Sequence, residues 1–159
     1  MQTPTASNVH PIARLPRRDA TCQVPQPVLD QPGILTVDAT WGTISPMQIA
    51  PGVGTVGELE VIDQIAAGLP LVDTRLEHFY SEGTIATARN IPHEQIAVAM
   101  DSLDSNVATV FFCNGPQCAA TPDAIRTLLT SGYPPEAILY YRGGMHDWMT
   151  LGLTLERHA

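Results

Sequence analysis

The sequence has no lysine, and its 159 residues carry only eight basic side chains, all of them arginine. Sixteen acidic residues give a formal net charge of −8, which argues against a nucleic-acid or anionic-membrane surface because such partners need clustered cations. Three arginines do lie together, at Arg14, Arg17 and Arg18. We interpret them as solvated charges in a proline-rich tail and assign them no function.

Long hydrophobic runs are also missing. No stretch approaches the roughly eighteen consecutive apolar residues of a membrane span. Prolines and polar residues interrupt the N-terminal region, where a secretory signal would need an apolar core. A cytoplasmic protein is therefore the default expectation, although a mature periplasmic chain with a new start methionine would have the same features.

Cysteine is scarce, with residues only at positions 22, 113 and 118. Three cysteines cannot make a disulfide scaffold, and the chain lacks the paired CxxC motifs of structural zinc sites. We expect no metal and no other cofactor. Cys22 lies in an irregular segment and is interpreted as incidental, whereas chemistry at Cys113 and Cys118 remains open.

The N-terminal third differs from the rest in composition. Eight of the fourteen prolines fall within residues 1–54, which show no sustained helical periodicity. We therefore predict an extended arm over residues 1–50 and a compact domain over residues 51–159. With 44% hydrophobic and 15% charged residues, a chain of this length can bury a substantial core.

Beyond this arm, helices and strands are predicted to alternate. TVGE has the spacing of a capping box with Thr55 as N-cap, and a helix should follow whose buried face holds Leu59, Ile62, Ile65 and Ala66. Another helix, over 93–103, should turn Ile96, Val98 or Ala99, and Leu103 inward. Later helices are predicted after Thr121, as an N-cap, and after the glycines at 143–144. Strands are predicted at 69–72, 88–91, 107–113 and 137–141.

This alternation predicts an α/β fold with right-handed crossovers and a mainly parallel sheet covered on both faces. Ligands of such folds bind beyond the carboxyl ends of the strands, where the loops after Val72 and Phe112 would meet. The strongest strand ends at Cys113, and the loop NGPQCAA leads from it into a helix. Amides in such a loop form an anion-binding nest that also stabilises a thiolate.

We therefore expect the pKa of Cys113 to lie below its free value of about 8.5, which would make this thiol a nucleophile. The alternative is that Cys113 is a small buried residue at a strand end. Four segments bear on the choice: LPLVDTR, EGTIATARNIP, VFFCNGPQCAATPDAIRTLL and AILYYRGGMHDW. In this order and spacing they resemble a single-domain rhodanese, of the thiosulfate sulfurtransferase-like family, over residues 55–155.

The resemblance implies a rhodanese-like fold with a mainly parallel five-stranded sheet and helices on both faces. It also implies a sulfurtransferase without a cofactor. The Cys113 thiolate would take sulfane sulfur from thiosulfate, a persulfide or a polysulfide. It would then carry the sulfur as a persulfide to a thiol or cyanide acceptor, or to a sulfur-carrier protein.

The resemblance assigns further residues. The family's active-site loop, whose amides would hold the terminal sulfur, matches Asn114, Gly115, Pro116, Gln117, Cys118 and Ala119. Asp73 and Arg75 match an acid and a base that brace the active-site side of the fold. Gly143 and Gly144 match a late glycine turn, and Trp148 matches the aromatic residue after it.

Departures from the family pattern leave alternatives open. Efficient users of thiosulfate often have a base or a hydroxyl where this chain has Cys118 and Ala119, so a persulfide, polysulfide or glutathione persulfide could be the better donor. Related phosphatases clamp phosphate with a cysteine, five residues and an arginine, and here the last position is Ala119, which disfavours phosphoryl transfer.

Cys118 has three interpretations: a small buried residue, a resolving thiol that forms a disulfide with Cys113, or a metal ligand. The disulfide would need β-carbons about 3.8 Å apart. The rival functions are thus a dithiol redox protein and a catalytically weak module that docks partners. His93 and His146 are interpreted as residues at the surface or beside the site, and Tyr140 and Tyr141 as core or rim aromatics.

Overall fold

The computed structural model describes residues 26–27, 29–32, 34–36 and 44–158. The interpretations of Cys22 and of the three clustered arginines fall outside these residues. In the N-terminal part, β1 (Gln26–Pro27) pairs with β2 (Leu35–Thr36) in an antiparallel ladder. Residues 44–53 follow without a helix or strand and lead into the domain.

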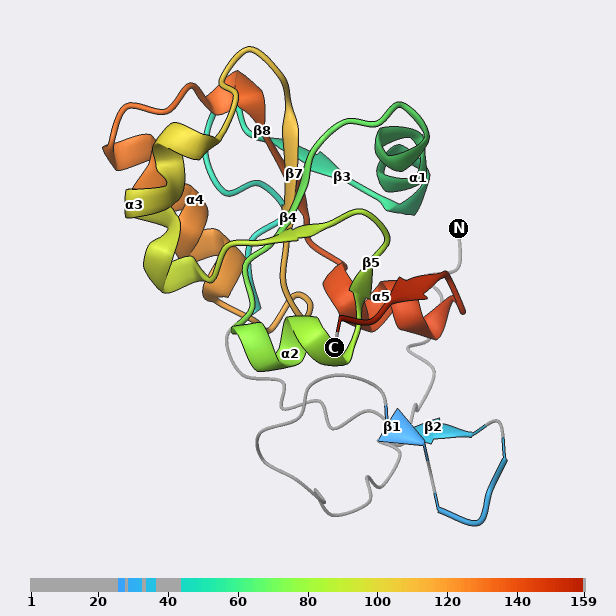
Figure 1. Cartoon of the computed structure of the whole chain (residues 1–159). Coiled ribbons are helices and arrows are strands. Elements are labelled where there is room, and N and C mark those ends of the chain that lie inside the picture. The colour runs from blue at the N-terminus through green and yellow to red at the C-terminus, as the bar shows by residue number, and fades with distance from the viewer. Residues whose placement is uncertain (1–25, 28, 33, 37–43, 159) are drawn as a thin grey trace, which may run out of the picture.

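A sheet of five parallel strands forms the centre of the domain, in the order β3-β8-β7-β4-β6 (Figure 1). The strands are β3 (Gly54–Val56), β4 (Leu71–Asp73), β6 (Arg89–Asn90), β7 (Thr109–Phe112) and β8 (Ile138–Tyr141). All four residues of β7 are buried, as suits the central strand of a parallel sheet. The predicted α/β fold and its five-stranded sheet are confirmed.

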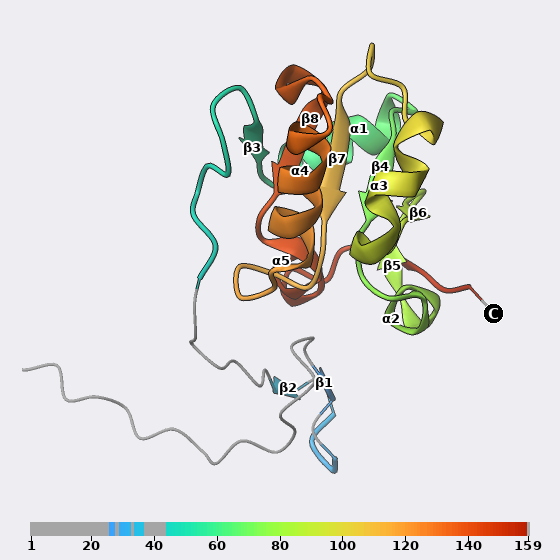
Figure 2. The same cartoon turned by 90° about the vertical axis from the view of Figure 1, so that its left-hand side faces the viewer.

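Helices cover both faces of this sheet, as Figures 1 and 2 show. One face carries α1 (Glu58–Ala66) and α5 (Gly144–Thr150), and the other carries α4 (Ala120–Thr130) with the short α3 (Ile96–Ala99). Two further elements lie near the carboxyl edge: α2 (Glu77–Glu82), and the antiparallel pair of β5 (Thr84–Ile85) and β9 (Leu155–Glu156). Among the described helices, none is long and apolar enough to cross a membrane.

Two apolar clusters form the core, one on each face of the sheet. Consecutive residues of β7 alternate between them: Val110 and Phe112 join the cluster under α1 and α5, whereas Phe111 joins the cluster under α3 and α4. Tyr140 of β8 lies in the same cluster as Phe111. This alternation also decides which side chains share a face at the carboxyl ends of the strands.

The predicted start of the first helix is wrong by two residues. Thr55 lies in β3, and Gly57 is the N-cap, with its N–H donating to Glu60 Oε2 at 3.1 Å. Val61 is buried and Ile65 packs against the core, whereas Leu59 is 75% exposed and Ile62 41% exposed. The predicted buried face is confirmed at Ile65 and wrong at Leu59, Ile62 and Ala66, because the helix turns Val61 and Gln64 toward the sheet.

Two other helix predictions need correction. Thr121 is not an N-cap, since α4 begins at Ala120 and the Thr121 side chain is buried. The helix predicted over 93–103 is a short α-helix between the 3-10 turns His93–Gln95 and Met100–Ser102. In it Ile96 faces the core as predicted, Ala99 and Leu103 pack against the same core cluster, and Val98, the alternative to Ala99, is exposed.

Candidate active site

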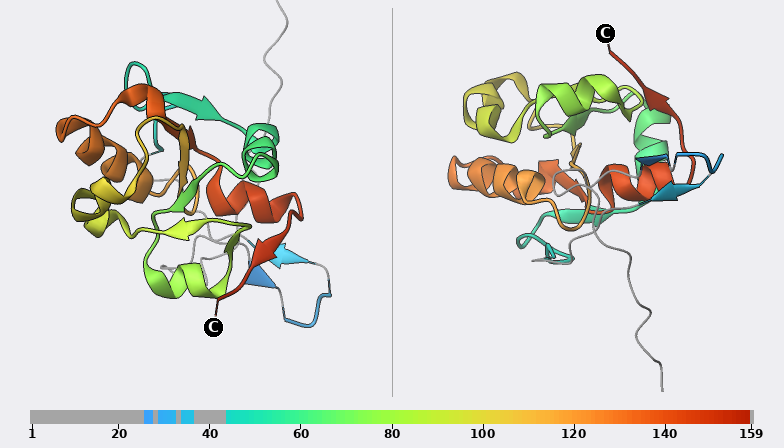
Figure 3. Two further views of the ribbon diagram at one scale, coloured as in Figure 1. Left: turned by 45° about the horizontal axis from the view of Figure 1, so that its top comes forward. Right: turned by 90° about the horizontal axis from the view of Figure 1, so that it is seen from below.

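Cys113 lies at the carboxyl end of the central strand, directly after β7, and only 1% of its surface is exposed. Its thiol donates to the carbonyl oxygen of Cys118, with Sγ and O 3.6 Å apart. The connection from Cys113 to α4 passes between α4 and α5 (Figure 3). The loop that the sequence singled out thus curls over the end of the sheet and closes on its own cysteine.

A glycine turn holds the outer side of this loop. The first turn of α5 donates two N–H groups to it: Met145 N–H to Cys113 O at 2.9 Å, and His146 N–H to Asn114 O at 2.8 Å. Gly144 has a φ of +58°, and a Cβ there would lie 2.4 Å from Cys113 O. Only glycine permits so close an approach in this conformation, so the glycine turn fixes the carbonyl side of the loop.

The N–H side of the loop faces the two sulfur atoms. Cys118 N–H closes a turn by donating to Gly115 O at 3.0 Å. The amides of Asn114 and Ala120 lie close enough to the Cys118 sulfur to lower its pKa, and the amide and hydroxyl of Thr121 act in the same way on Cys113. The loop is therefore an amide-lined cradle that holds two thiols.

The two thiols also lie close enough to affect each other, and their pKa values move in opposite directions. Burial raises the pKa of Cys113 well above its ordinary value, the hydrogen bond and charge of Cys118 raise it further, and Thr121 opposes them. The hydrogen bond from Cys113 lowers the pKa of Cys118 to about 6, against the effect of burial and with help from the Ala120 and Asn114 amides and His93.

This differs from the expectation for Cys113. The sequence predicts amides around the loop. It does not show that two of them, from Asn114 and Ala120, act on Cys118, whereas one, from Thr121, acts on Cys113. At neutral pH the pair holds its negative charge mainly on the half-buried Cys118, whereas Cys113 remains a thiol.

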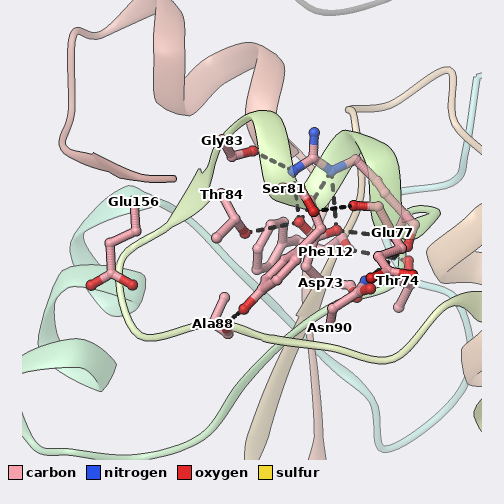
Figure 4. A network of polar contacts seen from close by, with 12 residues as sticks. Asp73, Thr74, Glu77, Ser81, Gly83, Thr84, Ala88, Asn90, Phe112 and Glu156 are labelled. Carbon is pink, nitrogen blue, oxygen red and sulfur yellow. Dashed lines mark hydrogen bonds and ion pairs between the residues drawn. The ribbon is translucent and has the colours of Figure 1, made fainter. Parts of the chain in front are cut away.

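The neighbouring strand β4 ends in a closed polar network around Asp73 and Arg75 (Figure 4). Asp73 Oδ1 accepts from Arg75 Nε at 3.0 Å, and Oδ2 accepts from Arg75 Nη2 at 2.7 Å. Arg75 Nη2 also donates to Gly83 O at 2.6 Å, while Thr84 Oγ1 donates to Asp73 Oδ2 at 2.8 Å. Both ion-pair side chains are almost wholly buried, so the pair ties β4 to the α2–β5 connection and does not reach the sulfur atoms.

Thr74 connects this network to the cysteine loop. Its N–H and its hydroxyl both donate to Phe112 O, at 2.9 and 3.1 Å, and its hydroxyl lies 2.8 Å from that of Thr121. Because Thr121 also lowers the pKa of Cys113, the two threonines link the end of β4 to the thiol. Sequence reasoning missed Thr74, although a hydroxyl between Asp73 and Arg75 at the end of a buried strand was a usable signal.

A segment far from the loop in sequence also contacts it. Ser45 N–H donates to Pro116 O at 2.7 Å, and Ser45 O accepts from Arg142 Nε at 2.9 Å. Sequence reasoning missed both Ser45 and Arg142. Nothing local marks Ser45, and Arg142 was seen only as part of the glycine turn.

The histidines take separate positions. His93 lies near Cys118 and affects its pKa, His146 Nδ1 lies 3.2 Å from Asp147 Oδ1, and His78 packs on Phe79 in α2. Within the described ranges, no group of three or more His, Cys, Asp or Glu side chains is placed to hold a metal ion.

Comparison with known proteins places this geometry in a family. The profile of the rhodanese-like domain matches residues 59–151, more than half of the chain. An HTH-type transcriptional regulator of Mycobacterium tuberculosis is 31% identical over 94 residues, which are 59% of this chain and 40% of the regulator. The chain thus spans well under half the length of that relative.

Solved structures show the same fold at lower identity. The BH2092 protein of Bacillus halodurans superposes with a TM-score of 0.59 and 22% identity, over 65% of this chain and 77% of that one. The thiosulfate sulfurtransferase of Pseudomonas aeruginosa gives a TM-score of 0.54 and 23% identity, over 67% of this chain and 21% of that one. Sequence profile and architecture agree, and the chain belongs to the rhodanese-like domain family.

Proposed function

We propose that this protein is a sulfurtransferase that carries sulfane sulfur on Cys113. The observation that supports this most directly is the position of Cys113: a thiol at the end of the central strand, under a loop whose amides face sulfur. Such amides stabilise a thiolate or the terminal sulfur of a persulfide. Asp73 and Arg75 are proposed to support the site from behind, through Thr74, without touching the substrate.

The reaction has two displacement steps. The Cys113 thiol, which donates to the Cys118 carbonyl oxygen in the resting site, first passes its proton to the neighbouring Cys118 thiolate. Cys113 Sγ then attacks the outer sulfur of the donor, and the donor's S–S bond breaks, so that sulfite leaves with the electron pair when the donor is thiosulfate. An acceptor thiolate or cyanide attacks the outer sulfur of the Cys113 persulfide and restores the Cys113 thiolate.

Mass spectrometry of the persulfide tests this proposal. After incubation with thiosulfate, a persulfide or a polysulfide, the peptide that contains Cys113 should gain the mass of one sulfur atom, and cyanide should remove it. Cys113→Ser should abolish both the adduct and the turnover. Sulfur transfer at the full rate by Cys113→Ser would contradict the proposal.

A second candidate is a dithiol redox cycle, which the hydrogen bond between the two thiols favours. The Cys118 thiolate would attack the inner sulfur of the Cys113 persulfide, form a Cys113–Cys118 disulfide and release hydrosulfide. The donor supplies the oxidising equivalent, and an external thiol must then reduce the disulfide. Sulfide release that disappears in Cys118→Ser would support this route. Unchanged transfer in Cys118→Ser, together with no disulfide in the treated wild type, would rule it out.

The remaining assignments are proposals of the same kind. A small thiol, cyanide or a sulfur-carrier protein is proposed as the acceptor, and a cytoplasmic location as the setting. The regulator of Mycobacterium tuberculosis contains a similar segment within a longer chain, but its activity and partners are its own. An intact Cys113 argues against a module that only docks partners.

A further inference from the structure

Arg142 supplies a positive charge that the cysteine loop itself lacks. Phe111 pairs with Tyr140 in the parallel ladder of β7 and β8. Cys113 and Arg142 each follow two positions later, just beyond the ladder, and both lie close enough to the Tyr140 hydroxyl to affect its pKa. Ser45 connects the two regions, because its O accepts from Arg142 Nε at 2.9 Å and its N–H donates to Pro116 O at 2.7 Å.

The guanidinium of Arg142 keeps binding capacity for a ligand. In the part of the chain that the structure describes, the carboxylate ion pairs of arginine involve Arg75 and Arg126, and Arg142 has no acidic partner. Its one recorded hydrogen bond uses Nε, whereas the two terminal amino groups are the atoms that clamp an oxyanion in bidentate fashion. Arg142 is also half-buried, which strengthens its interaction with an anion relative to a fully exposed cation.

Two buried polar atoms at the same place have no hydrogen-bond partner among the described residues. They are the Tyr140 hydroxyl and Asn114 Oδ1, and Tyr140 is fully buried. Burial raises the pKa of the Tyr140 hydroxyl to about 12, although a weak interaction with the Ser45 side chain and the charge of Arg142 lower it. It is therefore a neutral donor at neutral pH, with Ser45, Cys113 and Arg142 beside it and no hydrogen bond of full geometry among the described residues.

We propose that Arg142 and the Tyr140 hydroxyl determine donor specificity by binding the oxyanion end of the sulfur donor. Thiosulfate fits this arrangement, with sulfonate oxygens at Arg142 and its outer sulfur toward Cys113. When Cys113 attacks, the S–S bond breaks and the electron pair leaves with sulfite, whose negative charge Arg142 and Tyr140 stabilise. Cys118 and Ala119 stand where efficient users of thiosulfate often have a base or a hydroxyl; under this proposal the missing cation comes from the end of β8 instead. Sulfur transfer from thiosulfate to Cys113 rests on the proposed function, whereas the binding of the thiosulfate anion at Arg142 does not.

Calorimetry on the full chain tests the binding separately from the chemistry. Thiosulfate is titrated into Cys113→Ser, and into the same variant with Arg142→Gln, Tyr140→Phe or Arg126→Gln added. We expect Arg142→Gln to weaken binding at least about tenfold, since it removes a charge-assisted interaction, and Tyr140→Phe to weaken it a few-fold. Arg126→Gln is the matched control: it removes an arginine from the exposed side of α4, and binding should stay within about twofold because exposed charges are screened.

Turnover of the variants with Cys113 intact gives the second readout. Arg142→Gln should raise the KM for thiosulfate by a similar factor, leave transfer from the persulfide of cysteine methyl ester unchanged, and be partly rescued in Arg142→Lys.

Three results would overturn the inference. The first is thiosulfate binding that is equally strong in Arg142→Gln and Arg126→Gln, and the second is the absence of detectable thiosulfate binding in Cys113→Ser. The third is a loss of sulfur transfer in Arg142→Gln that is equally large with thiosulfate and with the persulfide donor. Arg142-dependent binding without any persulfide on Cys113 would instead refute the proposed function and leave the anion site standing.

Discussion

The ends of β4 and β7 lie side by side in the sheet, yet the polar groups after β4 are paired with one another, whereas those after β7 are not all paired. After β4, Asp73 and Arg75 are buried together and their charged atoms are paired with each other, with Gly83 and with Thr84. After β7, two thiols share a cradle of amides, and Asn114 Oδ1 has no hydrogen-bond partner in the described part of the chain.

The difference separates a structural role from a chemical one. A fully paired buried network has little left to offer a ligand, and its removal should cost stability. The cysteine loop has backbone amides that can still bind a ligand, and the pKa values of its thiols are shifted from their ordinary values. Substitutions in this loop should therefore reduce activity. The predictions below test this division, in order of decreasing expected effect.

Asp73→Asn should produce the largest loss, and it should be a loss of stability. The variant leaves the buried Arg75 without a counter-charge, which costs about 3 to 5 kcal/mol of unfolding free energy. Urea unfolding followed by circular dichroism measures it, and the fraction that remains folded should still form a Cys113 persulfide.

The matched control for this change is Asp123→Asn. It breaks an exposed pair with Arg126 at 3.4 Å and should cost less than about 0.5 kcal/mol. If the two variants lose similar stability, the network after β4 is not the brace that its burial indicates.

Gly144→Ala should affect both regions, because it places a Cβ against the cysteine loop. The positive φ and the 2.4 Å approach to Cys113 O should together cost about 2 to 3 kcal/mol and displace the loop. Sulfur transfer should fall more than about tenfold, since misplaced catalytic groups lose effective alignment.

Gly132→Ala separates the two causes. Gly132 also has a positive φ, of 87°, but a Cβ there would meet nothing within 4 Å. It should therefore cost only about 1 kcal/mol and leave sulfur transfer unchanged. A similar loss of activity in both variants would show that contact with the loop is not what matters at Gly144.

Thr121→Val should have a smaller effect on stability and on the pKa of Cys113, because Thr121 lies where the end of β4 meets the cysteine loop. It keeps the side-chain shape and removes the hydroxyl that meets Thr74 and Cys113, at a cost of about 1 to 2 kcal/mol. Because that hydroxyl lowers the pKa of Cys113, alkylation of Cys113 should shift to higher pH. Thr130→Val, which removes an exposed hydroxyl from the same helix, should change neither quantity.

The pH dependence of alkylation should show the smallest effect, a change of midpoint without loss of the fold. The reactive form of a thiol is the thiolate. The rate at Cys118 should therefore rise with pH around a midpoint of about 6 and fall as Cys118 is protonated below it. Iodoacetamide labelling with peptide mapping measures both sites.

Cys113 should react only at higher pH, and Cys118→Ser should shift its midpoint downward by removing two of the causes that raise its pKa. Labelling of Cys113 ahead of Cys118 at pH 6 to 7 would contradict this assignment of the charge.

Local patterns predicted the fold and the position of Cys113 at the end of a strand well. The apolar run up to Phe112 is long enough to mark a central strand, and a cysteine directly after it is placed by the strand alone. The first helix shows where local patterns fail: both Thr55 and Gly57 could begin it, and only the pairing of β3 with β8 takes Thr55 out of the helix.

The parts of the site that escaped prediction depend on contacts between distant residues. Thr121 was predicted as a helix N-cap because threonine is common at that position. Its hydroxyl instead hydrogen-bonds the hydroxyl of Thr74, at the end of the neighbouring strand. Ser45 and Arg142 are 97 positions apart in sequence, and no spacing rule connects them. The opposite shifts of the two thiol pKa values depend first on the burial of Cys113 and on its contact with Cys118, and a sequence does not specify either.

The hydrogen bonds of Ser45 also affect where this protein should be cut for study. The family match begins at residue 59, so a fragment trimmed to the shared segment would keep Cys113, the whole loop and Arg142. It would nevertheless lose the backbone group that holds Pro116 on one side and the arginine on the other. Two proteins could therefore share the matched segment residue for residue and still differ in substrate preference, because each brings its own flanking chain to the mouth of the common site.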